Sequence, residues 1–408
     1  MSDIPFLPSP IHLPGANIKV VGVGGAGCNA IDRMIQSGVT GVQFIAMNTD
    51  QQSLAQSKAH VKVALGPISM RGLGAGGNAE RGQTAAEESM EEVLAQLQGA
   101  DMVFITAGMG GGTGTGASPV VAGCAREIGA LTVAVVLTPF RWEGVNKADK
   151  AVQGLDNLRN TADTVIVVSN EKLLTLCEKG VKVKEAYRVA DGVLIQGVRG
   201  ITDLILRPGT LNGDFADVEA VLRNGREALI GTGAGRGEEA ILDALTRALD
   251  CPLLERENTG VASQVIVSIM ADWDRVELSA VETAMGYLSR HYHGHADIKL
   301  CQVEAPELDD RALVTVLASG FSEPGAAVPA PAEPEPAAAS AEPVRQANGE
   351  SVRVYGEVAQ AYQGGEPPLT PTRLLPQAPT PSGELVTLAE DLHVPAIIRM
   401  TQGRLPIE

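Results

Sequence analysis

The sequence predicts an α/β protein: a parallel sheet with helices on both faces, then a long helix, a smaller α+β domain and a disordered tail. Three observations carry this prediction. Runs rich in Val and Ile alternate with helix-length segments along the first half of the chain, as in sheets that are buried on both faces. One long amphipathic stretch follows, and a second group of strand and helix patterns comes after it. Beyond these, prolines crowd the end of the chain.

Six apolar, β-branched runs are expected to form the strands of the parallel sheet. They lie at 18–23, 44–47, 61–65, 102–106, 131–138 and 164–168. Helix-length segments such as 80–98 and 118–128 separate them, and an amphipathic stretch that ends at Ser37 follows the first run. This regular alternation favours parallel pairing of the strands.

The long periodic stretch 184–206 is expected to form one helix that leads away from the sheet. It ends at Arg207-Pro-Gly209, because proline and glycine both disfavour a continuing helix. The second domain is expected to combine helices at 217–224, 238–249 and 276–289 with strands at 261–270, 298–303 and 312–318. Its glycine-rich stretch, 231–237, is predicted to turn between a strand and a helix rather than to contact phosphate.

Proline content marks the last domain boundary. Fourteen of the 24 prolines follow Phe321, in segments whose low hydrophobicity cannot offset the entropy of ordering. The terminal segment regains apolar residues around 392–399, which is typical of a docking motif on a tether, the alternative being a frayed tail. The predicted division is a flexible N-terminal extension (1–16), a first domain with the long helix (17–206), a C-terminal α+β domain (207–321), a disordered Pro-rich linker (322–384) and a terminal docking peptide (385–408).

Composition excludes several classes of protein. The 408 residues carry 32 basic and 49 acidic side chains, a formal charge of −17, and only 3% are aromatic. Nucleic-acid binding needs clustered cations or stacking surfaces, so it is not expected. The N-terminus lacks the pattern of a secretory signal, and the longest apolar run, 131–137, is far shorter than the roughly 20 residues of a membrane-spanning helix. Five scattered cysteines without a C-x-x-C pair indicate reduced core thiols in a soluble, intracellular protein.

The first glycine-rich loop, Gly22-Val-Gly-Gly-Ala-Gly27, follows the first strand and opens the first helix. Glycines let the backbone approach a phosphate, and free N–H groups at a helix start attract its charge. The loop also fits the G-x-G-x-x-G pattern of dinucleotide-binding dehydrogenases, with Asp50 near the expected position of a ribose-binding carboxylate. This loop alone leaves both interpretations open.

Two further glycine-rich loops add to the first. Six glycines fall within nine positions of 108–116, directly before a helix, which is more than a simple turn needs. Thr113 and Thr115 offer hydroxyl donors there, or simply cap the helix. A third run, 72–78, is placed to close over a terminal phosphate. The sequence contains no G-x-x-x-x-G-K-[ST] motif, so the pattern is not that of a P-loop.

The second loop, Gly110-Gly-Gly-Thr-Gly-Thr-Gly116, resembles the signature loop of the tubulin/FtsZ family. The resemblance covers about residues 17–320 and implies a Rossmann-like parallel-sheet GTPase domain that a central helix joins to the smaller domain. It also implies a self-assembling cytoskeletal GTPase that forms the cell-division ring at the septum. The other matching motifs, in the family's order, are Asn48-Thr-Asp50, Gly72-Leu-Gly-Ala-Gly76, Asp101-Met-Val-Phe-Ile-Thr-Ala-Gly108, Pro139-Phe140, Glu143-Gly144, Arg207-Pro-Gly209 and Asn212-Gly-Asp-Phe-Ala-Asp-Val218.

The resemblance implies a GTP site with Mg²⁺ bridging phosphate oxygens, and it assigns no residue as a metal ligand. Glu143 is expected at the ribose with Lys147 nearby, and Asp191 is expected to accept hydrogen bonds from N1–H and the amine of guanine. Tyr187 is expected to stack on the base, although an aromatic at that spacing also suits a core. The residues expected around the phosphates are Gly24, Gly25, Ala26, Gly27, Cys28, Asn29, Ala75, Gly76, Gly77, Gly110, Gly111, Gly112, Thr113, Gly114 and Thr115, of which 75–77 would sense the γ-phosphate.

No general base is evident among these loops, and the resemblance implies that another subunit supplies the missing part. Asn212, Asp214 and Asp217 would enter the nucleotide site of the next subunit and position the attacking water. The alternative is that Asp214 and Asp217 cap a helix N-terminus. Head-to-tail contacts of this kind do not close, so they yield filaments. A non-catalytic scaffold of the same fold and an NAD-dependent dehydrogenase stay open as alternative functions.

The remaining expectations concern partners and location. The resemblance implies that the terminal peptide docks membrane-tethering and regulatory division proteins, without nucleic-acid partners and without direct membrane insertion. The protein is then expected in the cytoplasm, at the mid-cell division ring beneath the inner membrane. His291, His293 and His295 are expected in an exposed loop, because no acidic or Cys partner is spaced to complete a metal site.

Overall fold

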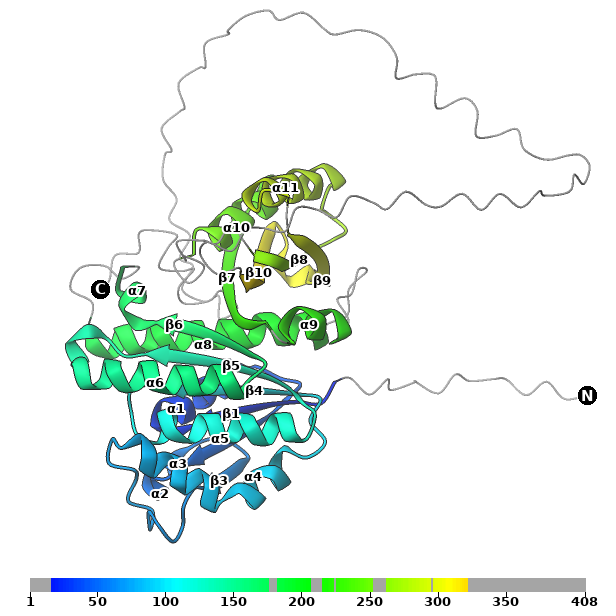
Figure 1. The fold of residues 1–408 in the computed structure, drawn as a ribbon. Helices are drawn as coiled ribbons and strands as arrows, with labels where there is room; N and C mark the ends of the chain where they lie inside the picture. The colour runs from blue at the N-terminus through cyan, green and yellow to red at the C-terminus, as the bar shows by residue number, and fades with distance from the viewer. Residues whose placement is uncertain are drawn as a thin grey trace, which may run out of the picture. The chain divides into compact units, whose positions relative to one another are not determined.

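Figure 1 shows a computed structural model of the chain. It describes residues 16–175, 182–206, 215–223, 225–251, 262–294 and 296–321. The strands are β1 (Ile18–Val23), β2 (Val42–Asn48), β3 (Val61–Ala64), β4 (Met102–Gly108), β5 (Leu131–Thr138), β6 (Thr164–Ser169), β7 (Arg226–Arg236), β8 (Ala262–Ala271), β9 (Asp297–Glu304) and β10 (Arg311–Phe321). The helices are α1 (Gly24–Gln36), α2 (Gln51–Gln56), α3 (Ala79–Glu88), α4 (Met90–Leu97), α5 (Thr113–Glu127), α6 (Val145–Thr161), α7 (Asn170–Thr175), α8 (Val183–Leu206), α9 (Phe215–Leu222), α10 (Ala240–Leu249) and α11 (Leu278–His291), with the 3-10 turns η1 (Arg141–Glu143) and η3 (Pro306–Leu308).

The strands form one sheet in the order β3-β2-β1-β4-β5-β6-β7-β10-β8-β9. Every neighbouring pair from β3 to β6 is parallel. β7 joins β6 through a short parallel ladder and pairs antiparallel with β10, so the second domain carries a mixed sheet. The predicted α/β class, with a parallel-sheet domain and a smaller α+β domain, is confirmed.

Both faces of the parallel sheet are buried, which explains the uniformly apolar strands. In β1, Val20 belongs to one core cluster and Val21 to the other, because successive side chains of a strand point to opposite faces. Helices α1 and α8 pack on the first face, and α3, α4, α5 and α6 pack on the second (Figure 1). The sheet is therefore held between two helical layers, and its edges are left for loops.

Helix α8 runs along the strands, from the edge of the sheet formed by their carboxyl ends to the edge formed by their amino ends. It follows α7, which begins directly after β6 ends, and its 24 residues span about 36 Å at 1.5 Å per residue. Its last residue, Leu206, lies against Gly41, just before β2 begins: a Cβ atom placed on Gly41 would be 2.6 Å from Leu206 Cδ1. The chain after α8 therefore starts at the edge of the sheet where the strands begin.

The predicted turn at 231–237 was wrong. Residues 231–236 complete β7, and only Gly237, with φ +85°, lies beyond the strand. A Cβ atom on Gly233 or Gly235 would lie 2.0 or 1.9 Å from the carbonyl oxygen of Ala244 or Ala240 in α10. These glycines let helix α10 lie directly on the strand, so their role is close packing.

The helix-length segment expected at 80–98 is helical but divided, since α3 and α4 meet at Ser89. The Ser89 hydroxyl accepts a hydrogen bond from Gly66 N and contacts Ala64 O, which ties this break to the end of β3. Helix α6 fills the helix-length segment between the fifth and sixth strand runs, for which no bounds were predicted. It buries only Ala151, Gly154, Leu155 and Leu158, so its apolar periodicity is weak.

Part of the predicted domain division lies outside the described residues: all of the N-terminal extension except Ala16, the Pro-rich linker and the terminal peptide. The boundary placed at 206/207 coincides with the end of α8 but stays a prediction. Within the described residues, no helix combines the length and the apolar character that a membrane crossing requires.

Candidate functional site

The first and second glycine-rich loops lie side by side where the strand order reverses. β1 and β4 are neighbours in the sheet, yet the strands that follow each of them extend in opposite directions, toward β3 and toward β6. The β1 loop leads into α1 and the β4 loop into α5. Open α/β sheets bind ligands at such a point, outside the carboxyl ends of the strands.

The first loop needs its glycines because it is pressed against strand β4 and the second loop. A Cβ atom on Gly27 would lie 2.3 Å from Thr106 O, and one on Gly24, whose φ is +73°, would lie 2.9 Å from Gly114 N. Gly25, Ala26 and Asn29 are exposed, and among the described residues no atom lies within 4 Å of a Cβ placed on Gly25. The exposed side of this loop therefore offers backbone N–H groups to a ligand.

Cys28 faces away from this surface. It is buried, and its Sγ lies 3.6 Å from Gly22 O and 3.8 Å from Met47 O. Burial and the nearby Asp32 raise the pKa of the Cys28 thiol to about 12. Cys28 was predicted to contact the nucleotide, but only its backbone can do so.

The second loop is closed by its own hydroxyl group. The buried Thr115 accepts a hydrogen bond from Gly110 N at 2.9 Å, and the Thr113 hydroxyl lies 2.6 Å from that of Thr49. Gly110 has φ +91°, whereas a Cβ on Gly111 would meet open space. The loop thus holds an open surface centred on Gly111.

Helices α1 and α5 begin without a side-chain cap, since the residues before them are Val23 and Gly112. The neighbouring α2 and α3 are capped, because Asp50 accepts from Gln52 N and Asn78 accepts from Arg81 N. The first N–H groups of α1 and α5 are therefore left for an anion. The capping alternative for Thr113 and Thr115 does not describe α5.

The third loop, 72–78, completes the same surface. Gly72, Gly74, Gly76 and Gly77 all have positive φ, which only glycine adopts without strain. The loop packs on the second loop, since a Cβ on Gly112 would lie 2.9 Å from Ala75 Cβ and 3.0 Å from Asn78 N. We call these three loops, 22–29, 72–78 and 108–115, the glycine cradle.

Four further predicted residues lie in η1, α6 and α8, outside the cradle loops. Glu143 accepts from Phe140 N at 3.1 Å and pairs with Lys147 Nζ at 2.8 Å. Burial and the Glu143 carboxylate raise the pKa of Tyr187, whose ring meets Phe140 edge-on at 5.3 Å. Trp142 is 61% exposed and stacks on Phe140 at 5.5 Å. Glu143, Lys147 and Tyr187 thus form one group beside an aromatic cluster.

Asp191 is the fourth. It is buried on α8, and its Oδ2 lies 2.9 Å from Nη1 of Arg33, a residue of α1. Burial raises the pKa of Asp191 to about 6, although the charge of Arg33 opposes this shift. A carboxylate in this setting accepts hydrogen bonds strongly once ionised.

Asn170 is a candidate that the sequence reasoning missed. It opens α7 directly after β6, at the same edge as the cradle loops, and α7 packs against α8. Asn170 is buried, and its Oδ1 has no hydrogen-bond partner among the described residues. Buried amides are nearly always partnered, so Asn170 is suited to a ligand group. Its position at the end of a predicted strand was the available signal.

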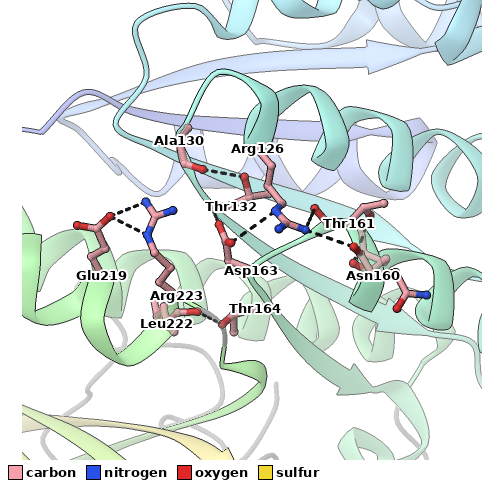
Figure 2. Close-up of polar contacts among 11 residues, drawn as sticks. Arg126, Ala130, Thr132, Asn160, Thr161, Asp163, Thr164, Glu219, Leu222 and Arg223 are labelled. Carbon is pink, nitrogen blue, oxygen red and sulfur yellow. Dashed lines mark hydrogen bonds and ion pairs between the residues drawn. The ribbon is translucent and has the colours of Figure 1, made fainter.

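Asp217 lies at the other edge of the sheet. Helix α9, which carries it, is fastened at Leu222 O by Thr164, the first residue of β6, as Figure 2 shows. Strands of six to eight residues separate that edge from the cradle by about 20 Å. Asp217 itself pairs with Lys299 Nζ at 2.6 Å. One chain therefore does not bring Asp217 to its own cradle, and Asn212 and Asp214 lie outside the described residues.

Figure 2 also shows how the edge around α9 is fixed. Arg126 donates to the carbonyl groups of Asn160 and Thr161 and lies 3.6 Å from Asp163, whose carboxylate accepts from Thr132 N. These bonds join the ends of α5 and α6 to the starts of β5 and β6. Side-chain contacts therefore hold together the helices and strands at the edge where α9 lies.

Comparison with known proteins identifies the family. A model of the tubulin/FtsZ family GTPase domain matches residues 17–178, and a model of the FtsZ family C-terminal domain matches residues 226–322. An empty FtsZ dimer from M. jannaschii is 41% identical, with a TM-score of 0.70 over 75% of this chain and 88% of that chain. The chain belongs to the tubulin/FtsZ family. The resemblance to this family that the sequence motifs indicated is confirmed.

Two more distant solved structures from Haloferax volcanii share the tubulin/FtsZ fold. A GTPγS-bound CetZ2 protofilament is 23% identical, with a TM-score of 0.63 over 75% of this chain and 93% of that chain. A GDP-bound CetZ1 monomer is 19% identical, with a TM-score of 0.64 over 75% and 94%. Family membership makes the chain a cytoskeletal GTPase by fold and supports GTP binding at its GTPase domain.

The dehydrogenase alternative loses its key residue. Asp50 was its expected ribose ligand, but the carboxylate accepts from Gln52 N, Ser53 N and Ser53 Oγ at 2.9 to 3.3 Å. These bonds, led by the Ser53 hydroxyl, lower the pKa of Asp50. Its oxygens are engaged in capping α2, so they are not directed at a ribose.

The histidine run is only partly a loop. His291 ends α11 and is exposed, His293 follows with φ +54°, and His295 lies outside the described residues. Tyr292 between them is buried. Among the residues that the structure describes, no group of three His, Cys, Asp or Glu side chains could hold a metal ion.

Proposed function

We propose that the chain binds GTP in the glycine cradle, assembles head to tail into filaments, and hydrolyses GTP at the interface between successive subunits. The observation that carries this proposal is the separation of the two predicted halves of the active site. The cradle lies at the carboxyl ends of the strands, whereas Asp217 lies at their amino ends. Two such edges meet when one subunit stacks on the next.

In this proposal each loop has a defined task. The backbone N–H groups of 24–29 and 110–115 bind the α-, β- and γ-phosphates, and 75–77 meet the γ-phosphate. Glu143 and Lys147 hold the ribose, Tyr187 stacks on guanine, and Asp191 accepts from the base. Phosphoryl transfer depends mainly on positioning and charge stabilisation, and fixed loops supply the positioning.

Asn212, Asp214 and Asp217 of the adjoining subunit would position the attacking water. Asp217 is held by Lys299, so its carboxylate has a fixed place at the edge opposite the cradle before assembly. Mg²⁺ fits this site as a companion of the nucleotide, because the cradle offers N–H groups and hydroxyls rather than a carboxylate cage. When bound to phosphate oxygens, it would neutralise their charge.

The same stacking accounts for a filament. A head-to-tail contact is heterologous, so it continues from subunit to subunit and does not close. Relatives support this part of the proposal: one is recorded as an FtsZ dimer and another as a GTPγS-bound protofilament. We further propose a place in the division ring beneath the membrane, with the peptide 385–408 docking tethers and regulators.

Phosphate release and sedimentation with GTP or GDP, measured across protein concentration, test the proposal. A shared active site predicts that the turnover per molecule stays near zero below a threshold concentration and rises above it, together with sedimentation. Turnover proportional to concentration from zero would contradict it. Filaments without phosphate release would instead favour the non-catalytic scaffold.

A further inference from the structure

Lys150, a residue of helix α6, reaches the third loop of the glycine cradle. Its Nζ donates a hydrogen bond to Gly77 O at 2.7 Å. Lys150 is half-buried and lines a hollow between α3, α5 and α6 that also contains Thr115 and Glu80. An ammonium group therefore lies beside the loop that the proposed function assigns to the γ-phosphate.

Helix α6 is fixed rigidly enough to aim this side chain. A Cβ atom on Gly154 would lie 2.4 Å from Thr115 Cγ2, and one on Gly110 would lie 2.7 Å from Lys147 O. Helix α6 thus touches the second cradle loop at two successive points on either side of Lys150. From this fixed helix, the side chain of Lys150 extends to Gly77 in the third loop.

Hydrogen bonds hold both ends of the third loop, but few hold its centre, residues 75–77. Gly72 O accepts from Gln51 N and Gly74 N donates to Thr49 O, both at 3.1 Å, while Asn78 caps α3. Within the described residues, the hydrogen bond from Lys150 is the only one that reaches 75–77 from another element. Gly76 and Gly77, with φ +61° and +74°, give this centre much conformational freedom.

We propose that Lys150 is a positioning residue that holds the Gly76–Gly77 turn in the conformation that receives the γ-phosphate, so that it favours GTP over GDP. The inference rests on the proposed GTP binding in the cradle. Since GDP lacks the phosphate that this turn would meet, removal of Lys150 affects GTP binding selectively. A lysine supplies a compact charge on a flexible stem, which suits contact with a single carbonyl.

The test compares Lys150→Met with Lys150→Arg and Lys62→Met. Lys62 is a matched control, because its Nζ also donates to a backbone carbonyl, Ala55 O at 3.0 Å, but on an edge strand away from the cradle. Dissociation constants for GDP and for a non-hydrolysable GTP analogue are measured on the full chain, below the assembly threshold. Amide hydrogen exchange of 72–78 is followed in the same samples.

Lys150→Met is expected to weaken binding of the GTP analogue by about two- to tenfold, the range of one net hydrogen bond, while GDP affinity stays unchanged. Exchange of the 75–77 amides should become faster, Lys150→Arg should restore the preference for the analogue, and Lys62→Met should match the wild type. Equal losses for both nucleotides, or no loss, would overturn the role of Lys150. A wild-type chain that binds neither nucleotide would instead refute the proposed function.

Discussion

At the residue scale, Asp191 shows how burial prepares a side chain for binding. The carboxylate lies on the long helix with Arg33 at 2.9 Å, and its pKa of about 6 reflects burial more than this ion pair. An ionised Asp191 would accept from guanine, whereas the protonated form accepts less well. Base recognition should therefore depend on pH.

We predict that GDP affinity rises with pH between 5.5 and 7.5. Because the pKa is raised to about 6, roughly a quarter of Asp191 is ionised at pH 5.5 and nearly all at pH 7.5, a difference of about fourfold in affinity. Titration calorimetry at each pH measures it. The range stops at pH 5.5 because the sequence pI is about 4.9.

Asp191→Asn is the control for this prediction, since the terminal phosphate of GDP also titrates near this range. The variant keeps the shape of the side chain but cannot ionise, so its remaining pH dependence belongs to the nucleotide. A wild-type profile that runs parallel to the profile of this variant, with no extra rise through pH 6, would argue against recognition of the base by Asp191.

The sequence reached most of these residues through resemblance, and it missed those defined only by packing. Gly25, Gly111 and Glu143 fall in motifs and were found. Arg33 and Lys150 do not stand out locally, because contacts with α8 and with the third loop bring them into place. Asn170 follows a predicted strand, but only its burial without a hydrogen-bond partner for Oδ1 among the described residues singles it out. Cys28 was named from its place in the motif, but its side chain points into the core.

At the element scale, helix α5 combines a crowded and an open glycine. A Cβ on Gly116 would lie 1.9 Å from Ala79 O and 2.7 Å from Gln83 N, where α5 meets α3. A Cβ on Gly123, two turns later, would meet no atom within 4 Å. Replacing each glycine with alanine therefore distinguishes two effects on stability. One is the close packing of α5 on α3 at Gly116, and the other is the general cost of a glycine in a helix at Gly123.

We predict that Gly116→Ala destabilises the chain by about 2 to 3 kcal/mol, since the backbone of α3 has to move away. Gly123→Ala should stabilise it by about 0.5 to 1 kcal/mol, because alanine loses less conformational entropy in a helix. Urea unfolding midpoints of both variants measure the difference. Similar midpoints would mean that α3 and α5 are not packed as closely as the structure shows.

Strand β7 and the bounds of helix α6 escaped prediction for physical reasons. The alternating glycines Gly231, Gly233 and Gly235 suggested a turn, yet a period of two is also that of a strand. The backbone of α10 packs directly on Gly233 and Gly235. Helix α6 carries few apolar residues, since it covers the sheet with Ala151, Gly154, Leu155 and Leu158 alone. Local patterns describe a strand or helix only when its buried face is made of large side chains.

At the scale of the whole molecule, the fold class followed from the sequence because both faces of the sheet demand apolar strands. The order of the strands and the joining of β6 to β7 did not, since they depend on pairing between segments far apart in the chain. The long helix α8 connects the parallel-sheet domain to α9 and the second domain. By carrying the chain across the sheet, α8 places α9 at the edge opposite the cradle.

This separation makes a mixing experiment decisive for an active site shared between subunits. One variant, Asp214→Ala, loses the predicted catalytic loop and should still bind GTP. The other, Gly111→Asp, places a negative charge in the open part of the cradle, where no atom lies within 4 Å, so it should fold but not bind GTP. Each is expected to release almost no phosphate alone.

The measurement that tests the central claim most directly is phosphate release by an equal mixture of these two variants, with Asp214→Ala mixed with Asp217→Asn as the control. In random stacking, about one interface in four joins an intact cradle to an intact catalytic loop, so the mixture should recover about a quarter of wild-type turnover, and the control none. A mixture no more active than its separate components would contradict hydrolysis at the interface between subunits.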